Sequence, residues 1–410
     1  AFVSLRHRNF RLYFCGQMIS LAGSSMQTIG QAWLVLKLTH SPIQLGLVGA
    51  LQALPILLFS LFGGVLADRW PKRGVLLVTQ CAAMLQALAL WLLITSGAIA
   101  VWQLYLLAPL LGLTSSLGRP ASRAFIVEMV AREDVPNAVA LNSSLGTIAR
   151  VVGPGVAGVI IAASSATTLF LLNALSFLPV VAALALMRSH ELHSQPASES
   201  SSTARQTTWQ SLREGIGYVW QAPATMHVIL VVGFVLLFGS NFNVVLPLFA
   251  TDTLHQGARA YGFLSAATGL GALASALWLA WRERRTTIRG LLLGMLAFAA
   301  LEAAFALTPI YIPSLVLIAG VGFAETTFAT QAITLLYALT PDRLRGRVMS
   351  VQVVLFDGSV PLGYMLLGWL SAALGVSRAL LVGAALCLLV TAVGWLSRKP
   401  AEQDMAQAAV

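Results

Sequence analysis

The sequence predicts an all-α membrane protein in which twelve transmembrane helices form two pseudo-symmetric six-helix bundles. Of its 410 residues, 58% are hydrophobic and only 10% are charged, whereas a soluble domain carries about 25% charged residues. A helix needs about 20 mainly apolar residues to cross a bilayer, and twelve stretches meet this requirement. These stretches cover roughly residues 10–36, 43–67, 74–96, 102–127, 137–163, 166–187, 223–250, 259–281, 288–308, 310–338, 347–372 and 375–397.

Lysine and arginine gather in alternate gaps between these stretches. The odd-numbered gaps hold only Lys37, Arg259 and Arg378, while the even-numbered gaps and both ends of the chain are rich in basic residues. Cytoplasmic loops of membrane proteins carry such an excess of positive charge. We therefore expect a multi-pass protein of the cell inner membrane with both termini in the cytoplasm. Orientation then explains the net charge of +10, and the charge is no evidence for a nucleic-acid partner.

A serine-rich segment separates the first six apolar stretches from the last six. Residues 189–208 are poor in large apolar side chains, so burial cannot offset the entropy cost of ordering, and we expect a flexible linker. Apolar residues then recur at helical spacing from Trp209 to Trp220, which predicts an amphipathic helix on the inner membrane face. The predicted parts are an amino-terminal bundle (1–188), a linker with its surface helix (189–222), a carboxy-terminal bundle (223–398) and a cytoplasmic tail (399–410).

The two halves of the sequence also repeat weakly. Gly46 aligns with Gly262 within matching four-residue segments, at an offset of 216 residues, and Val139 aligns with Val348 at an offset of 209 residues. Two pseudo-equivalent bundles around a site at the bilayer midplane are a common plan of transporters. The repeat therefore supports a transporter built from two related halves.

No pattern in the sequence is typical of an enzyme, a metal site or an ATP-driven pump. Cys15, Cys81 and Cys387 lie within apolar stretches, which argues against a secreted disulfide framework, and no Cys/His spacing indicates zinc. The sequence contains neither a nucleophile–base pair nor a phosphate-binding loop. We therefore expect a protein that is not an enzyme, needs no cofactor and is not driven by ATP hydrolysis.

The loop between the second and third apolar stretches is the most charged short segment of the first hundred residues. Residues 63–73 read GGVLADRWPKR. This segment closely resembles the cytoplasmic-loop signature of the major facilitator superfamily, except that proline replaces a glycine of the usual pattern. The resemblance implies that Gly64, Asp68, Arg69 and Arg73 form a latch that closes the cytoplasmic side in the outward-open state.

Two further motifs resemble one branch of that superfamily. Residues 5–11 follow the pattern Leu-x-x-x-Asn-Phe-Arg, and residues 41–46 follow Ser-Pro-x-x-x-Gly. Both are similar to the drug–proton antiporter branch that contains macrolide-efflux and enterobactin-exporter proteins. The resemblance implies a monomeric, proton-coupled exporter that moves amphipathic small molecules, either drugs or siderophore-like compounds, by alternating access within membrane lipids. A lipid or lysolipid flippase of the same fold is the first alternative, and an integral-membrane enzyme is the second.

Arg150, Glu302, Glu325 and Asp357 are charged residues that fall well inside apolar stretches. A charge at the bilayer centre costs about 2.5–3.5 kcal/mol on insertion scales, so such residues usually face a cavity or a partner. The resemblance implies that Arg150, Glu325 and Asp357 lie near the cavity or the seam between the halves, which makes all three candidates for proton coupling. We expect one or both of Glu325 and Asp357 to carry the coupled proton. A static buried ion pair is the alternative. Glu302 lies in the peripheral ninth span, where we expect helix packing or snorkelling.

Two motifs in the fourth and fifth spans concern gating and antiport. Gly153, Pro154 and Gly158 resemble the Gly-Pro-x-x-x-Gly signature of drug–proton antiporters, with Ala157 in place of one closing glycine. Close helix packing explains these small residues equally well. Arg119 lies lower in its span than the proton-linked arginine of the superfamily, so we expect it at a cytoplasmic gate or against a lipid headgroup.

Amide-bearing and aromatic side chains in three spans are candidates for the substrate cavity. Together they predict a large, amphipathic and weakly charged cavity, although a lone amide more often serves helix packing. The candidates are Gln17, Gln27, Gln31, Trp33, Asn241, Asn243 and Gln331.

Overall fold

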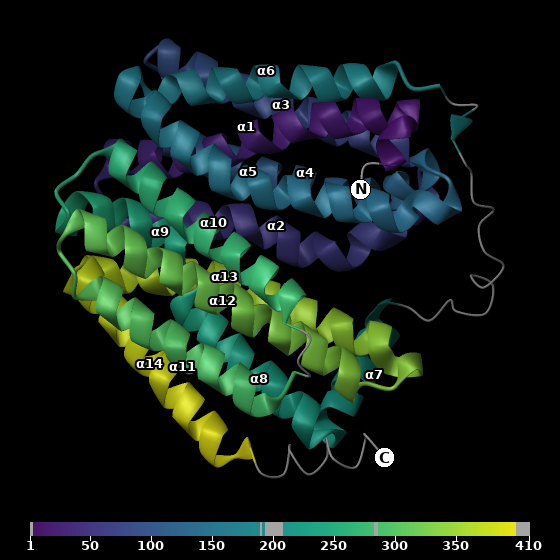
Figure 1. Ribbon diagram of the computed structural model, residues 1–410. Helices are drawn as coiled ribbons and strands as arrows, with labels where there is room; N and C mark the ends of the chain where they lie inside the picture. Colours follow the sequence, from purple (N-terminus) through teal and green to yellow (C-terminus); the bar gives the residue numbers. More distant parts are fainter. Residues whose placement is uncertain (1–2, 189–190, 193–207, 283–285, 399–410) are drawn as a thin grey trace. The chain divides into compact units, whose positions relative to one another are not determined.

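The computed structural model describes residues 3–188, 191–192, 208–282 and 286–398, and it describes the backbone alone for residues 60–69 and 208–212. This part of the chain is helical throughout, without strands (Figure 1). The first six long helices are α1 (Arg8–Thr39), α2 (Pro42–Arg69), α3 (Lys72–Thr95), α4 (Val101–Met129), α5 (Val135–Ala163) and α6 (Ala166–Ala185). The later elements are α7 (Thr208–Gln221), α8 (Pro223–Gly239), α9 (Phe242–Leu248), η5 (Phe249–Thr253), α10 (Ala258–Trp281), α11 (Ile288–Ala306), α12 (Tyr311–Leu339), α13 (Asp342–Leu374) and α14 (Val376–Leu396).

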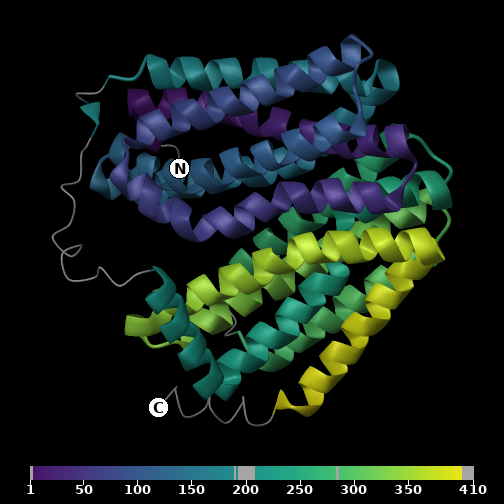
Figure 2. The ribbon, with the colours of Figure 1, turned by 180° about the vertical axis from the view of Figure 1, so that it is seen from behind.

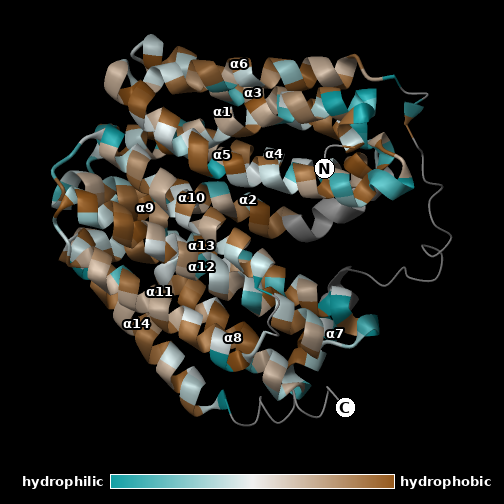
Figure 3. Ribbon diagram, viewed as in Figure 1, coloured by the Kyte–Doolittle hydropathy of each residue, from teal (hydrophilic) through white to brown (hydrophobic). Residues whose placement is uncertain are grey.

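The predicted spans correspond to these long helices. Among the described residues, eleven segments are long and apolar enough to cross a membrane. The remaining long helix, α1, has 32 residues and carries more polar side chains, including Gln17, Gln27 and Gln31. Twelve spans are therefore consistent with the structure. Figure 3 shows hydrophobic residues along the lengths of the long helices and hydrophilic residues at several helix ends.

The seventh span is broken, although the sequence predicted one continuous helix over residues 223–250. Helix α8 ends at Gly239 and α9 begins at Phe242. Asn241 has a non-helical backbone, and its side chain donates a 2.9 Å hydrogen bond to the carbonyl of Leu237. This bond pairs a carbonyl that the broken helix would otherwise leave free. The break carries Ser240 and Asn241 at membrane depth, where polar groups need partners.

The chain divides into two compact units. The amino-terminal unit comprises Ala1–His40 and Leu51–Arg205, and the carboxy-terminal unit comprises Ser41–Ala50 and Gln206–Val410. The first turns of α2 thus group with the carboxy-terminal unit, whereas the sequence assigned residues 1–188 to one bundle. Within the amino-terminal unit, α1 packs against α5 and α6, and α3 packs against α4 and α6. Within the carboxy-terminal unit, α12 packs against α10 and α11, and α14 packs against α8 and α11 (Figure 2).

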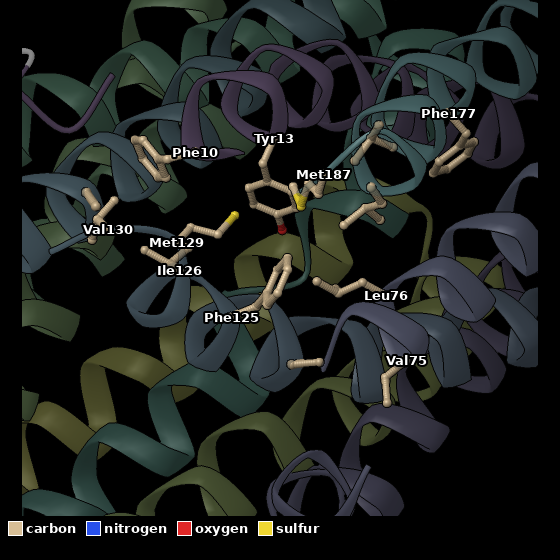
Figure 4. Packing of buried hydrophobic residues seen from close by; sticks show 14 of the residues in the cluster. Phe10, Tyr13, Val75, Leu76, Phe125, Ile126, Met129, Val130, Phe177 and Met187 are labelled. Atoms are coloured by element: carbon tan, nitrogen blue, oxygen red, sulfur yellow. The ribbon is translucent and has the colours of Figure 1, made fainter. Parts of the chain in front are cut away.

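A buried aromatic cluster joins the helices of the amino-terminal unit near one end. The rings of Tyr13 and Phe125 meet edge to face with centroids 6.3 Å apart, and the Tyr13 hydroxyl lies 2.6 Å from that of Ser122. Figure 4 shows Phe10 and Met129 beside them. All of these apolar side chains are at most 1% exposed. The cluster therefore fixes α1 against α4, and the tyrosine hydroxyl has the partner that a buried polar group requires.

The two units repeat one close contact between helices. In the amino-terminal unit, a Cβ atom added to Gly112 of α4 would lie 2.0 Å from the carbonyl oxygen of Gln52 in α2. In the carboxy-terminal unit, a Cβ atom added to Gly322 of α12 would lie 2.2 Å from the carbonyl oxygen of Thr268 in α10. Small residues allow such close approach of membrane helices. Thr268 follows Gln52 by the offset of 216 residues that the sequence repeat predicted, so the repeat has a structural counterpart.

Helix α7 docks on its own unit. Glu214 forms an ion pair with Arg347 of α13, and the Tyr218 hydroxyl donates a 3.1 Å hydrogen bond to the carbonyl of Leu339. Val219 is buried, while Ile216 and Trp220 are 41% and 71% exposed. The predicted amphipathic helix is therefore present. One part of its surface packs against α13, while Ile216 and Trp220 lie on its exposed surface.

Substitution of Gly215 by valine is expected to lower the stability of the protein. A Cβ atom at Gly215 would lie 2.6 Å from the Arg347 carbonyl oxygen, so α7 must move away from α13. Overpacking of this kind costs about 1–3 kcal/mol. Thermal unfolding in detergent measures the loss. The matched control is Gly217→Val in the same helix, where nothing lies within 4 Å. Equal unfolding midpoints for the two variants would contradict the docking of α7 on α13.

Candidate functional site

Two carboxyl groups and a hydroxyl group meet inside the carboxy-terminal unit. Glu302 comes from α11, Glu325 comes from α12, and Ser240 lies in the break between α8 and α9. The Ser240 hydroxyl donates a hydrogen bond to Oε1 of Glu325. The two carboxyl groups lie close enough to interact electrostatically. We call Glu302, Glu325 and Ser240 the carboxyl cluster.

Glu302 faces the interior of its unit, so the expected snorkelling is wrong. The residue is 1% exposed, and neither carboxyl oxygen has a hydrogen-bond partner within the described structure. Its position explains the orientation, because it lies on the buried stripe of α11. That stripe consists of Leu291, Met295, Phe298, Glu302 and Phe305, all at most 1% exposed. Their spacing follows the helical period, a signal that could have been read from the sequence.

An amide and two tyrosines adjoin the carboxyl cluster. Nδ2 of Asn243 donates a 2.7 Å hydrogen bond to the Tyr364 hydroxyl. Tyr364 interacts electrostatically with Glu325 and with Tyr261, which is fully buried. Asn243 is exposed, and its place in a substrate cavity stays a prediction. Sequence reasoning selected Asn243 and Glu325 but missed the two tyrosines and Ser240, because a single hydroxyl in an apolar span has little influence on hydropathy.

Aromatic rings border the cluster on one side. The Phe298 ring lies 5.3 Å from Phe328 and 6.4 Å from Phe242, both edge to face. The thiol of Cys387 on α14 also interacts electrostatically with Glu302. The rings and the thiol make the side of the cluster that holds Glu302 weakly polar. Electrostatic interactions there are stronger than in water.

The other charged residues of the spans occupy more open positions. Asp357 lies on α13 and Arg150 on α5, and both are exposed within the described residues. Their expected parts in proton coupling stay predictions. Glu325, the third coupling candidate, is the one that the structure joins to a second carboxyl group.

Gln27 serves helix packing in the amino-terminal unit, contrary to its predicted place in a cavity. The residue is fully buried, and its Nε2 donates a 2.8 Å hydrogen bond to Gln86. Its Oε1 accepts a hydrogen bond from Asn173, and Gln86 in turn donates to the carbonyl of Leu107. This chain of hydrogen bonds links α1 to α3, α4 and α6. An amide whose nitrogen and oxygen both have hydrogen-bond partners has little hydrogen-bonding capacity left for a substrate.

The remaining cavity candidates differ in how far their side chains are exposed. Gln31 is 4% exposed and donates a 2.9 Å hydrogen bond to Gln52, and Asn241 is buried at the helix break. Gln17, Trp33 and Gln331 are half-buried. Gln31 and Asn241 therefore have packing contacts, and the cavity roles of Gln17, Gln31, Trp33, Asn241 and Gln331 stay predictions.

The predicted cytoplasmic latch is described in part. The side chains of Gly64, Asp68 and Arg69 lie outside the described residues. Arg73 donates hydrogen bonds of 2.7 Å and 3.0 Å to the carbonyls of Leu184 and Ala185, at the carboxyl end of α6. A cation there is favourable because helix carboxyl ends carry partial negative charge. Arg73 thus binds carbonyl groups of its own unit.

Arg119 and the antiporter-like motif lie in α4 and α5 of the amino-terminal unit. Arg119 is exposed, and its gating role stays a prediction. Gly153, Pro154 and Gly158 are buried. A Cβ atom on Gly153 would lie 2.5 Å from the Cβ atom of Ser25 in α1. The motif therefore packs α5 closely against α1, and any further role in antiport stays a prediction.

A cavity of about 470 Å³ lies at one end of the amino-terminal unit, away from these candidates. Its lining residues are Arg6, His7, Arg8, Asn9, Met129, Glu191 and Leu192. His7 contacts Asp134 at 2.8 Å, and the Asn9 side chain donates a 3.0 Å hydrogen bond to the Arg188 carbonyl. These internal contacts indicate that the polar side chains join the start of α1 to the turn before α5 and to the segment after α6.

The chain is similar in sequence to known transport proteins. It matches the family model described as "Transmembrane secretion effector" over residues 1–410. It is 26% identical over 369 residues to the enterobactin exporter EntS of Escherichia coli O1:K1, covering 89% of this chain and 86% of that protein. It is 30% identical over 168 residues to the staphyloferrin A transporter of Staphylococcus aureus, covering 41% of this chain and 42% of that protein.

Solved structures of transporters share the fold. A bacterial homologue of the human lysosomal transporter Spinster has a TM-score of 0.74 at 15% identity, over 97% of this chain and 98% of that chain. A POT peptide transporter also has a TM-score of 0.74, at 14% identity, over 97% of this chain and 95% of that chain. The family match and these folds agree with a transporter, not an enzyme. The chain belongs to the transmembrane secretion effector family of the major facilitator superfamily.

Proposed function

We propose that the protein is a proton-coupled exporter of amphipathic small molecules, of the siderophore or drug type, that works by alternating access. The observation that carries this proposal is the match to an enterobactin exporter over 89% of the chain. The partial match to a staphyloferrin A transporter supports the same substrate class. The protein would act as a monomer in the cell inner membrane, with both termini in the cytoplasm, and would need no cofactor.

The carboxyl cluster supports proton coupling. Ionisable residues inside membrane spans are costly, and they commonly belong to ion or proton pathways. Glu325 can be stabilised as a carboxylate by the Ser240 hydroxyl and can be neutralised by a proton when that bond is lost. One charge moved across 100 mV is worth about 2.3 kcal/mol, which is enough for roughly fifty-fold accumulation. A single coupled proton therefore supplies adequate driving force.

The surroundings of the cluster suit an amphipathic molecule. Exposed Asn243 offers an amide beside the Tyr364 hydroxyl, and the aromatic ring of Phe242 lies close to the break in the seventh span. Small-molecule sites are mostly apolar, with a few polar groups that fix orientation. Such a surface favours a molecule with aromatic and polar parts over a polyol, which needs a dense set of polar contacts.

Transport in proteoliposomes tests the proposal. The panel contains enterobactin, staphyloferrin A, ethidium and lysophosphatidylcholine, each measured with and without an imposed pH gradient. We expect the gradient to drive at least one of the first three compounds, and a protonophore to abolish that transport. Movement of lysophosphatidylcholine alone would favour a flippase. Equal rates with and without the gradient would contradict proton coupling.

A further inference from the structure

Neither helix packing nor the proposed coupling role of Glu325 explains why an acid, Glu302, is buried inside the carboxy-terminal unit. Both of its oxygens lack a hydrogen-bond partner within the described residues, and the side chain is 1% exposed. Buried polar groups in proteins are almost always hydrogen-bonded, so an exception requires a reason. An ionised carboxylate without a partner in this apolar surrounding is strongly disfavoured. The neutral acid is the form that the site can accommodate.

Among the described residues, the groups that interact with Glu302 include no cation to balance it. Helix α11 packs against α8, α12 and α14. The Glu325 carboxyl on α12 and the Cys387 thiol on α14 interact electrostatically with Glu302. Both become negative when they ionise, so each opposes a charge on Glu302.

The basic residues on the helices packed against α11 lie at different heights along the helix axes from the groups that interact with Glu302. Arg378 precedes Cys387 by nine residues on α14, about 13 Å along the helix axis. His227 on α8 precedes Val235, whose carbonyl contacts the Cys387 thiol, by eight residues, about 12 Å along the axis. His227 instead lies 3.5 Å from the Ser397 hydroxyl. On α11 itself, Arg289 lies in the first turn, thirteen residues before Glu302.

Glu325 differs from Glu302 in its hydrogen bonding. The Ser240 hydroxyl donates to Glu325, and this bond favours the ionised form of that group. Ser240 lies at the break of the seventh span, where its amide donates the last i→i−4 hydrogen bond of α8 to the Leu236 carbonyl. A shift at the break that moves the Ser240 hydroxyl away would remove its stabilisation of the carboxylate. The protonated form of Glu325 would then become more favourable.

We propose that Glu302 is a second proton-binding carboxyl group and that it forms one titrating unit with Glu325. With Ser240 bound to Glu325, the pair holds one proton on Glu302 and one negative charge on Glu325. Uptake of a second proton by Glu325 neutralises the pair, and release returns it to the singly protonated state. Two interacting carboxyl groups titrate as a pair and not as independent sites. The link between this proton and transport rests on the proposed function. The protonation of Glu302 rests only on its burial and its lack of hydrogen-bond partners.

Infrared difference spectroscopy of the purified protein tests the protonation directly. At neutral pH, exposed carboxyl groups are ionised, and a protonated buried acid gives a carboxylic C=O stretching band. We expect this band in the wild-type protein and in Glu325→Gln, and we expect its loss in Glu302→Gln. The control is Glu133→Gln, because Glu133 is exposed in the 3₁₀ turn before α5. A band that persists in Glu302→Gln, or is absent from the wild type, would overturn the proposal.

The pH dependence of the infrared band tests the coupling between the two acids. With glutamine at position 325, the negative charge beside Glu302 is absent, so Glu302 should lose its proton, and the band should disappear, at a pH about one unit lower than in the wild type. Loss of the band at the same pH in both proteins would show that the two acids do not titrate as a pair. Thermal unfolding should show Glu325→Gln and Glu302→Gln folded, since an amide is neutral. If the wild type transports none of the panel, the proposed function fails, while the infrared band still decides the protonation of Glu302.

Discussion

Substitution of Gly271 by leucine is expected to cause a larger loss of stability than the substitution of Gly215. Gly271 lies where α10 crosses α12, and a Cβ atom there would be 1.8 Å from the Ala319 carbonyl oxygen and 2.9 Å from the Phe323 amide nitrogen. Both atoms belong to the backbone, so no side-chain rotation relieves the clash. The helices must separate, which costs about 3 kcal/mol or more.

Thermal unfolding of the detergent-solubilised protein measures this effect. The matched control is Gly233→Leu in α8, where nothing lies within 4 Å of an added Cβ atom. We expect a markedly lower unfolding midpoint, or no folded protein, for Gly271→Leu and a near wild-type midpoint for Gly233→Leu. Similar midpoints would show that α10 and α12 do not approach each other closely at Gly271. The Gly322 contact with Thr268 lies in the same interface, so its substitution should act in the same direction.

The second large effect is expected for Glu325→Gln, which should abolish accumulation driven by the pH gradient. Glutamine is similar in shape to glutamic acid but cannot exchange a proton, and it leaves the Ser240 hydroxyl an oxygen acceptor. Accumulation of enterobactin in proteoliposomes should fall from as much as roughly fifty-fold to none. Exchange of substrate down its own gradient should continue, because the variant removes the coupling and not the path.

Asp357→Asn provides the comparison between the two coupling candidates. If Glu325 carries the proton alone, this variant keeps proton-driven accumulation. Loss in both variants would show that the two acids act together. Full accumulation in both would remove the coupling role from Glu325 and Asp357 alike. Glu133→Gln, which changes an exposed acid outside the spans, controls for a general effect of lost negative charge.

Hydropathy alone did not reveal much of the carboxyl cluster. Hydropathy measures how long and how apolar a segment is, but not which way a side chain points. Glu302 was therefore expected at the periphery, although the buried stripe of α11 turns it inward. Gln27 shows the opposite case. It was expected to line a cavity, but its amide nitrogen is hydrogen-bonded to Gln86 and its amide oxygen to Asn173.

The break in the seventh span was also beyond the sequence pattern. Residues 223–250 are largely apolar, and between the start of α8 and Ser240 no proline marks the break. Asn241 ends α8 because its side chain supplies the Leu237 carbonyl with a partner in place of the helical one. Local helix propensity alone would not predict that a side chain replaces the helical amide as the partner of the Leu237 carbonyl.

The sequence by itself determined the helical membrane class, the positions of the twelve spans and the weak repeat of the two halves. These features depend on length, hydropathy and spacing, which each segment carries on its own. Only the tertiary structure decided that Glu302 is buried near enough to Glu325 to interact with it electrostatically, that Ser240 donates a hydrogen bond to Glu325, and that Gln27 is hydrogen-bonded between helices. Such pairings depend on which faces of separate helices come together, and no single segment contains that information.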